Sequence, residues 1–396
     1  MVFFEIGTSL NCTKFVIRKG SNIMRKIKFN ILIVFTSLLI LPTILKSQEA
    51  TVSGKDALGR DSLVWDNSIL PVAFYLPETS FAAGATGILS FKKSSQGEEE
   101  RPSQLLFAAI YTLKNQLEIL GTFEFYADER KHRLKGEFGY YIYSYNYFGI
   151  GADSRAEDLE KYKVNFPRFQ LSYSRKILGL FNLGVGYRMD DFSMGEREEN
   201  GLLLTNKPIG WDGGFKSNYE FNFFVDTRDN INAPYRGFYG EVVFQGSMEW
   251  FFSDYDYRKL DIDLRYFTPL GNDWTLGHQL WVTHSSSGAP FYEVGHISTA
   301  SRSRGFDDRR FIAYKMATYQ SELRFPIAGK KLRGSAFYTY NIMPDSWSSP
   351  FASREFFSYG IGLRYYLIEK SRAGIRLDVA RGDGKYNFYL TFNEAF

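Results

Sequence analysis

Cysteine and histidine are scarce in this sequence. Of its 396 residues, one is cysteine (Cys12) and four are histidine (His132, His278, His284 and His296). A disulfide needs two cysteines and a thiolate zinc site needs several, so the sequence excludes both. There is no His-x-x-x-His metal spacing, no Gly-x-Ser-x-Gly motif and no glycine-rich phosphate loop. We therefore expect no enzyme activity, no metal and no cofactor.

An excess of one charge is also missing. The formal net charge is +4, but residues 1–47 hold seven Lys and Arg and a single acidic residue. Without them, 41 basic and 43 acidic residues remain, a net charge of −2. Nucleic-acid-binding domains are basic, so the sequence predicts no nucleic-acid partner.

Long apolar runs are limited to one, from Ile31 to Leu45, and its 15 residues are fewer than the ~20 of a membrane-spanning helix. Basic residues from Met24 to Lys28 precede the run, and a polar stretch including Ser47 follows. This order predicts a signal peptide that starts at Met24, is cleaved near Ser47 and exports the chain from a bacterial cytoplasm. Residues 1–23 then reflect a misplaced start codon. The alternative is an uncleaved anchor helix.

Aromatic residues are abundant, at 18% of the chain, and occur in segments of alternating polarity. The clearest segment sets Leu260, Ile262, Leu264 and Tyr266 against Lys259, Asp261, Asp263 and Arg265. A period of two is that of a β-strand, whose successive side chains point to opposite faces. Each such segment therefore has one apolar and one polar face.

Alternation fits both a soluble sandwich and a membrane barrel, and three features favour the barrel. The segments run 10 to 15 residues, whereas globular strands usually have about 5–6. Aromatic residues gather at the segment ends, as in the interfacial girdles of outer-membrane barrels, and the leader supplies export. The sequence thus predicts an all-β fold, a transmembrane antiparallel β-barrel surrounded by lipid in the bacterial outer membrane.

Fifteen strands are predicted from the alternation. They lie near 80–92, 103–113, 116–127, 132–146, 163–177, 179–191, 214–227, 236–250, 256–269, 272–285, 313–326, 331–342, 355–367, 371–381 and 386–396. Single-chain bacterial barrels have even strand numbers, so we add a first strand at 62–75 and predict sixteen, with fourteen as the alternative. The chain then divides into a leader (1–47), a short segment (48–61) and the barrel (62–396). The short segment falls below the ~50 residues of a folded domain.

Long and short connections differ in position. Long ones are predicted at 147–162, 192–213, 286–312 and 343–354, and short turns at Asn115, Leu178-Gly179 and Asn272-Asp273. Outer-membrane barrels carry long loops outside and short turns in the periplasm. We therefore expect the two sets at opposite ends.

Several motifs occur in an order that resembles one family. They are Asp226-Thr-Arg228-Asp229-Asn with Pro234-Tyr-Arg-Gly237, Ser303-Arg304-Gly305-Phe306, Gly360-Ile-Gly-Leu-Arg364, Arg376-Leu-Asp378-Val-Ala, and a last strand ending in Phe396. From about residue 71 onward the chain resembles the BamA/TamA superfamily of outer-membrane barrels, the bacterial surface antigen family. The first motif also has a plain interpretation as a solvated periplasmic turn, because its Asn, Pro and Gly residues favour turns and its charges can pair.

The resemblance implies a lock inside the barrel. In the family, the long loop before the last five strands enters the lumen, and its Arg pairs with acidic residues on the inner wall. Arg304 is then the lumen Arg, with Phe306 against the wall, and alternation turns Glu322 inward as its partner. The family commonly has Asp where Thr339 stands, so we expect a looser lock, shared by Asp378 or Glu220. The alternative is an external loop with an exposed Arg304.

The last predicted strand carries Phe392 and Phe396 on its apolar face. A terminal aromatic on the lipid face resembles the signal that the outer-membrane assembly machinery recognises. We therefore expect Phe396 to face lipid and that machinery to be a partner during biogenesis.

Two kinds of function follow. The resemblance implies a barrel that inserts, translocates or displays other polypeptides. The family captures these with periplasmic POTRA domains, for which residues 48–61 leave no room, so a separate periplasmic protein would supply that role. The alternative is a stand-alone narrow pore or structural barrel. A remote alternative is a barrel lipid hydrolase that uses His284 with Ser285 to Ser287.

Overall fold

The computed structural model describes residues 63–93, 102–297, 299–369 and 371–396. The predicted leader with its Met24 start, the cleavage point near Ser47 and the segment 48–61 lie outside these residues. No helix in the described part is long and apolar enough to cross a membrane.

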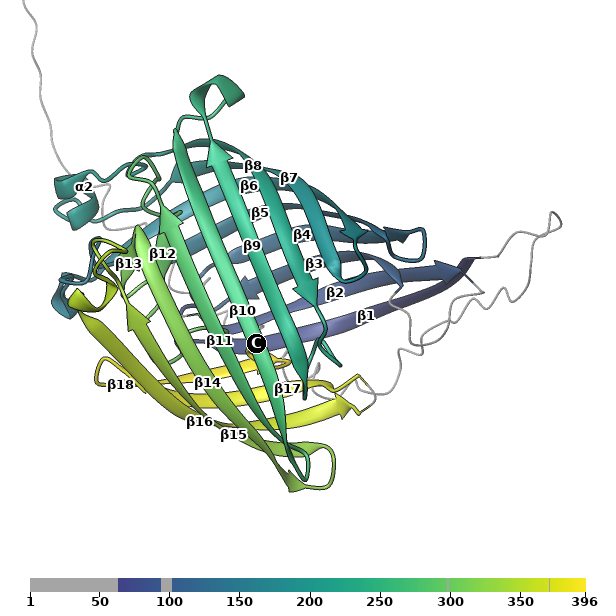
Figure 1. The fold of residues 1–396 in the computed structure, drawn as a ribbon. Coiled ribbons are helices and arrows are strands. Elements are labelled where there is room, and N and C mark those ends of the chain that lie inside the picture. Colours follow the sequence, from purple (N-terminus) through teal and green to yellow (C-terminus); the bar gives the residue numbers. More distant parts are fainter. Residues whose placement is uncertain (1–62, 94–101, 298, 370) are drawn as a thin grey trace, which may run out of the picture. The chain divides into compact units, whose positions relative to one another are not determined.

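Sixteen long antiparallel strands close into one barrel (Figure 1). They are β1 (Leu63–Leu76), β2 (Ser80–Lys93), β3 (Ser103–Thr112), β4 (Leu117–Ala127), β5 (His132–Tyr147), β6 (Glu160–Ile177), β7 (Phe181–Met194), β8 (Gly213–Asp226), β9 (Gly237–Ser247), β10 (Tyr257–Gly271), β11 (Trp274–Ser285), β14 (Lys315–Ala328), β15 (Leu332–Ile342), β16 (Glu355–Ile368), β17 (Ala373–Gly382) and β18 (Lys385–Phe392). The predicted fold class and the count of sixteen are confirmed, and the alternative of fourteen is wrong.

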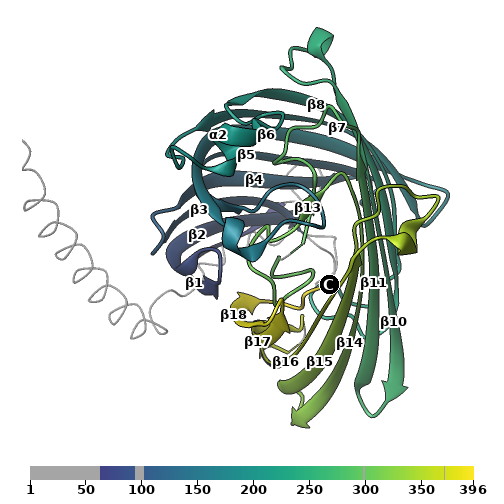
Figure 2. The same ribbon diagram turned by 90° about the vertical axis from the view of Figure 1, so that its left-hand side faces the viewer.

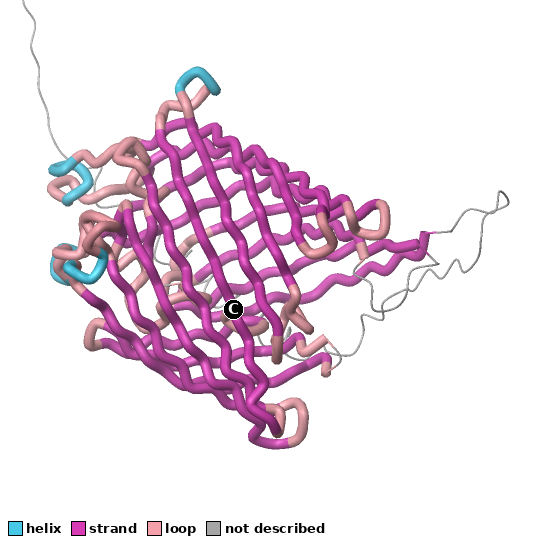
Figure 3. Tube along the Cα trace, viewed as in Figure 1, coloured by secondary structure: helices cyan, strands magenta, loops and turns pink. Residues whose placement is uncertain are grey.

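Each barrel strand pairs with the next one along the chain, and β1 meets β18 to close the ring. Between β11 and β14 the chain makes a separate two-stranded sheet, β12 (Gly295–His296) with β13 (Ile312–Ala313). The helices in the described part are short and lie in the connections (Figure 3). They are α2 (Leu202–Asn206), η1 (Ala156–Asp158), η2 (Glu249–Phe251) and η3 (Pro350–Ala352).

The strand faces have the polarity of a membrane barrel. On β10, Leu264 and Tyr266 are 37% and 55% exposed on the outer surface. Asp263 and Arg265, which alternate with them, point inward, where Arg265 Nη2 lies 2.6 Å from Asp263 Oδ2. Apolar side chains therefore cover the outside and charged side chains pair inside, which reverses the arrangement of a soluble sandwich.

The four predicted long connections share one end of the barrel. They are the segments 148–159, 195–212, 286–314 and 343–354, which with 248–256 are odd-numbered connections counted from the β1–β2 turn. The connection 227–236 is also long but is even-numbered, and it lies at the opposite end. The turn at Asn115, between β3 and β4, lies at this end too, so its predicted place among the periplasmic turns is wrong. Connections alternate strictly between the two ends, and position in that order, not length, decides the end.

Strand bounds differ from the predicted ones by at most three residues, except at the end of the chain. The predicted last strand, 386–396, stops at Phe392. The chain turns at Asn393, which has a φ of 58°, and residues 394–396 leave the wall.

Candidate functional site

The connection 286–314 leaves the wall after β11 and lies inside the barrel. In the end view of Figure 2, its β13 lies within the ring of strands. Arg304 and Phe306 are 0% and 2% exposed. The structure thus places the Arg-Gly-Phe motif in the lumen, not on the external surface.

Arg304 bridges two carboxylates of the inner wall. Its Nη2 donates to Glu322 Oε2 at 2.6 Å, and its Nη1 donates to Asp378 Oδ2 at 2.5 Å. Its Cζ lies 3.5 Å from the centroid of the Phe337 ring. None of the three charged side chains has exposed surface. Because an unpaired buried charge is costly, this pairing offsets the cost of bringing Arg304 into the lumen.

Further arginines share these carboxylates. Arg364 lies 2.6 Å from Asp378 and 3.1 Å from Glu322, and Arg324 lies 2.9 Å from Glu322. A third carboxylate, Glu394, lies 2.9 Å from Arg364 Nε. Sequence analysis missed Glu394, because the predicted last strand included it on the face of Phe392 and Phe396, whereas the observed strand ends at Phe392.

Two acids, Asp378 and Glu220, were expected to share the lock in place of an acid at position 339, and one of them does. Thr339 is fully buried on β15 and carries no charge, but Asp378 on β17 supplies the second carboxylate. Glu220 lies on β8, where it accepts hydrogen bonds from Asn222 and Gln245. The second carboxylate is therefore Asp378, the first of the two expected alternatives, and the alternative part for Glu220 is wrong. Which strands lie near Arg304 is decided by barrel closure, not by spacing in the sequence.

The glycine of the motif packs on the last two strands. Its N–H donates to Tyr389 Oη at 2.7 Å, and Asn387 Nδ2 donates to Phe306 O at 2.9 Å. Gly305 has a φ of 109°, and a Cβ there would lie 2.8 Å from the carbonyl carbon of Arg381. Only glycine fits both the conformation and the space.

A second ion cluster holds the first half of the loop. Lys216 on β8 pairs with Glu293 of the loop and lies 2.8 Å from Asp190 on β7. Arg188 lies 2.8 Å from Asp190 and 3.6 Å from Glu293. Burial would raise the pKa of Glu293, but Lys216 and Arg188 lower it to about 2, so it is ionised at neutral pH. Sequence analysis did not find this cluster. Alternation turns Lys216 inward, but only the fold brings Glu293 to it.

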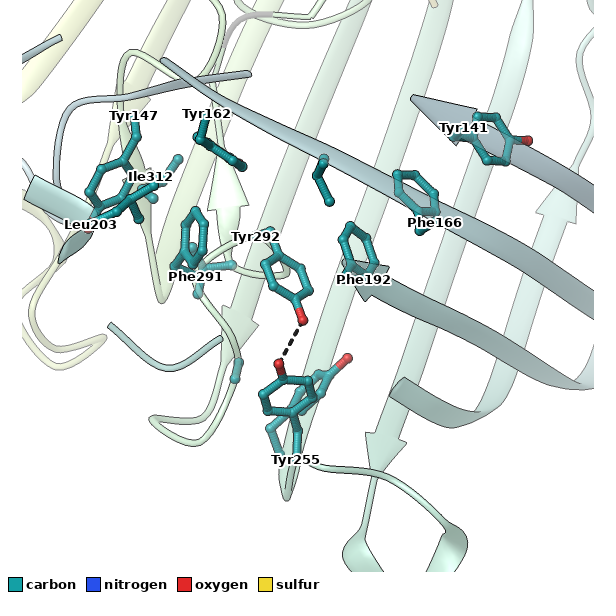
Figure 4. Packing of buried hydrophobic residues seen from close by; sticks show 14 residues of the cluster. Tyr141, Tyr147, Tyr162, Phe166, Phe192, Leu203, Tyr255, Phe291, Tyr292 and Ile312 are labelled. Atoms are coloured by element: carbon teal, nitrogen blue, oxygen red, sulfur yellow. Dashed lines mark hydrogen bonds between the residues drawn. The ribbon is translucent and has the colours of Figure 1, made fainter. Parts of the chain in front are cut away.

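Aromatic rings of the wall and the loop pack beside this cluster (Figure 4). Phe192 stacks between Phe166 and Tyr292, with ring centroids 4.4 and 4.3 Å apart. Tyr292 Oη donates to Tyr255 Oη at 2.9 Å, and Lys216 Nζ lies 5.4 Å from the Phe192 centroid. Stacked, buried rings make the first half of the loop part of the inner core.

The strand–turn motif lies at the end opposite the long loops, between β8 and β9. Asp226 Oδ2 lies 2.8 Å from Arg228 Nη2, as the charge pattern suggested. Asp229 instead pairs outside its own turn, 2.8 Å from Arg372. Gly237 has a φ of 113°, a conformation that favours glycine.

The two residues of the predicted assembly signal point to different sides. Phe392 is 48% exposed on the outer surface, whereas Phe396 is 4% exposed. Phe396 packs on inward-facing Phe267, with ring centroids 6.0 Å apart. The expectation that Phe396 faces lipid is therefore wrong, because alternation ends where the strand ends, at the turn of Asn393.

The barrel has one weak seam. Among the described residues a single register pair, Tyr75 with Leu390, joins β1 to β18. Every other pair of neighbouring barrel strands is matched over at least eight residues. Within the described part of the chain, residues Asn67 to Phe74 of β1 thus have no matched neighbour on the β18 side.

In the hydrolase alternative, His284 and Ser285 point to opposite sides of the wall. His284 is exposed on β11, whereas the next residue, Ser285, is 2% exposed and points to the opposite side. No group of three or more His, Cys, Asp or Glu that could hold a metal ion occurs in the described part of the chain.

Comparison with known proteins places this barrel in a family. The Omp85 superfamily domain matches residues 93–396, and no curated protein matches the sequence. BamA from Haemophilus ducreyi lacking POTRA domains 1–3 is 16% identical at a TM-score of 0.56, over 89% of this chain and 75% of that one. CdiB from Escherichia coli is 11% identical at a TM-score of 0.54, and the match covers 89% of this chain and 68% of that one. CdiB from Acinetobacter baumannii is 14% identical at a TM-score of 0.51, and the match covers 88% of this chain and 64% of that one. This chain therefore spans less than two thirds of that CdiB. These identities show a shared fold, and the domain match covers most of the sequence: the chain belongs to the Omp85 superfamily.

Proposed function

We propose that this Omp85 barrel works in the bacterial outer membrane, where it inserts or transports other polypeptides, and that the seam between β1 and β18 is its working part. The observation that carries this proposal is the unmatched edge of β1. Unpaired N–H and C=O groups along an edge are a template on which another strand can add.

The side chains of β1 support the same use. Leu63, Trp65 and Ile69 share one face and are 43%, 39% and 60% exposed. An incoming β-strand would gain main-chain hydrogen bonds along the edge and apolar contacts on the lipid side. The partners we propose are barrel or secreted polypeptides that arrive unfolded, with a separate periplasmic protein to deliver them.

The test is site-specific photo-crosslinking in cells. A benzophenone side chain at Ile69, on the unmatched edge, should form adducts with outer-membrane barrel precursors or secreted polypeptides during their synthesis. The matched control is Leu264, which is also exposed but lies on β10, paired with Gly240 on one side and Leu280 on the other. Adducts at both positions in equal yield, or at neither, would contradict the proposal.

A stand-alone pore or structural barrel is the second candidate. One observation favours it: every long strand in the described part belongs to the barrel, and this part carries no receptor module. The crosslinking experiment separates the two, since a pore would form no adducts with precursors.

We also propose that the chain is not a lipid hydrolase. The opposite orientation of His284 and Ser285 supports this, because a serine nucleophile and its base must lie within hydrogen-bonding reach.

A further inference from the structure

We propose that two segments, 227–236 and 393–396, cross the periplasmic mouth of the barrel and close it, and that Glu394 ties this floor to the Arg304 network. We call the two segments together the floor. The inference rests on the barrel alone and does not depend on the handling of polypeptides proposed above.

The first segment, 227–236, joins β8 to β9 but binds the turn between β16 and β17. Four strands, β10, β11, β14 and β15, separate β9 from β16 in the wall. Even so, Asn230 Nδ2 and Asn232 Nδ2 donate to Ser371 O at 3.2 and 3.0 Å. A turn that started at β8 and stayed beside its own strands could not reach this carbonyl, so the segment must cross the mouth.

Arg372 holds the same segment from the far side. Its Nη1 donates to Asp229 Oδ2 at 2.8 Å and to Ala233 O at 2.9 Å, and its Cζ lies 3.7 Å from the centroid of the Tyr235 ring. Ala233 and Pro234 are buried. An ordinary solvated turn would leave these groups in water. Here one guanidinium grips a carboxylate, a carbonyl and a ring of a segment from another part of the wall.

The second segment, 393–396, crosses in the other direction. It leaves β18, yet Phe396 packs on Phe267 of β10, and Arg324 Nη2 of β14 donates to Phe396 O at 2.9 Å. A Cβ on Gly277 of β11 would lie 3.2 Å from the Phe396 ring, so the contact is close. The end of β18 is thus fixed against the opposite part of the wall.

The two segments meet, and the meeting point is connected to the loop. The Glu394 N–H donates to Asn232 O at 3.1 Å, while the Glu394 carboxylate lies 2.9 Å from Arg364. Arg364 in turn contacts Glu322 and Asp378, the two carboxylates that hold Arg304. Floor and loop therefore share one buried ion network, and a change at either end alters the partners available at the other.

Solvent access to the lumen tests the floor directly. Val243 lines a lumen cavity of about 510 Å³ together with Asp261, Gln279 and residues of the loop. A Val243→Cys variant should react slowly with a bulky, water-soluble maleimide. Adding Asp229→Asn with Arg372→Gln, or adding Glu394→Gln, should speed this reaction severalfold. The matched control is Lys330→Gln, at the same mouth but 80% exposed and paired only loosely, at 3.9 Å, with Glu369.

Each variant is first checked for heat-modifiable migration on a gel, so that only folded barrels are compared. Equal rates in the floor variants and in the Lys330→Gln control would overturn the proposal. So would a wild-type rate as fast as that of the denatured chain. If a floor variant fails to fold, a second measurement decides: Asn230→Cys and Ser371→Cys should join through a short bismaleimide in the folded barrel, and failure to join would refute the crossing.

Discussion

Arg304 is a guanidinium without exposed surface between two carboxylates from different strands, Glu322 and Asp378. A planar fork can donate to both at once, which an ammonium group cannot do with the same fixed geometry. The network holds four arginine side chains but three acidic side chains. They are Arg304, Arg324, Arg364 and Arg376, with Glu322, Asp378 and Glu394. The carboxylates are therefore the limiting members of the network.

This imbalance predicts unequal effects of the two lock substitutions. Glu322→Ala leaves four arginines with two acids and should destabilise the barrel by about 3–5 kcal/mol, the usual cost of breaking a buried ion pair from one side. Arg304→Ala leaves equal numbers of both signs and should cost less, while freeing the loop. Urea unfolding of both variants in detergent, with exposed Lys330→Ala as the control, measures the difference. A larger loss for Arg304→Ala than for Glu322→Ala would contradict this account.

The loop 286–314 is the element that organises the lumen, and it is held at two distant places. Its first half packs on β5 to β8 through Glu293 and the aromatic cluster, and its second half packs on β14 to β18 through Arg304 and Gly305. Between these halves its Arg302 stacks on Trp281 of β11, with Cζ 3.8 Å from the ring centroid. An element anchored at both halves is held in the lumen by the inner wall itself, without a helix or a separate plug domain.

The interaction of this loop with the β1–β2 turn, between Asp308 and Glu78, should depend on pH. Burial and then the nearby Asp308 raise the pKa of Glu78, in the β1–β2 turn, to about 7, and burial raises that of Asp308 to about 6 despite Arg309 and Lys114. A carboxyl whose folded pKa is raised stabilises the fold when protonated, and this stabilisation is lost as pH rises through the folded pKa. We therefore expect residues 305–312 to gain hydrogen-exchange protection as the pH falls from about 8 to about 5.

Glu78→Gln, which mimics the protonated carboxyl, should flatten the upper part of this pH dependence. Glu369→Gln, on a turn at the other end, should leave it unchanged. Protection that is the same at both pH values in the wild type would show that the two carboxyls do not control the contact.

At the scale of the whole barrel, apolar side chains face outward and paired charges face inward. The loop 286–314 lies at one end of the lumen, and the two floor segments lie at the other. The weakest join in the wall is that between β1 and β18. Since β18 also continues into the floor through residues 393–396, the last strand takes part in the seam, the floor and the lock together. The stability of the closed barrel should therefore depend more on Phe396, in the floor, than on Phe392, an equally large residue on the lipid face.

Phe396→Ala and Phe392→Ala test this dependence as a matched pair. Phe396 is buried inside, so its truncation should cost about 3–5 kcal/mol, as for other buried aromatic residues, whereas Phe392, 48% exposed on the outside, should cost less. The measurement is the temperature at which the compact band on a gel converts to the unfolded one. If Phe392→Ala lowers this temperature more than Phe396→Ala does, the residue on the lipid face contributes more to stability, which would contradict this account.

Much of this architecture follows from the sequence by itself. A period of two is a local property, so alternation alone predicts fifteen of the strands and the inward position of Glu322, Asp263 and Arg265. The sixteenth strand follows from the even strand number of single-chain bacterial barrels. The motif Ser303-Arg304-Gly305-Phe306 also predicts a loop position through its resemblance to a family. These features need only neighbouring residues along the chain, and the structure shows them where they were expected.

The tertiary structure alone decided which of these residues meet. Alternation gives the face of a side chain but not its neighbours around the ring, since those depend on how sixteen strands close with a common stagger. Asp378 therefore reaches Arg304 across 74 residues, and Arg372 reaches Asp229 across 143. Phe396 turns inward for a related reason. Beyond Phe392 no strand imposes a face, and the inner wall offers Phe267 for ring contact and Arg324 as a hydrogen-bond donor.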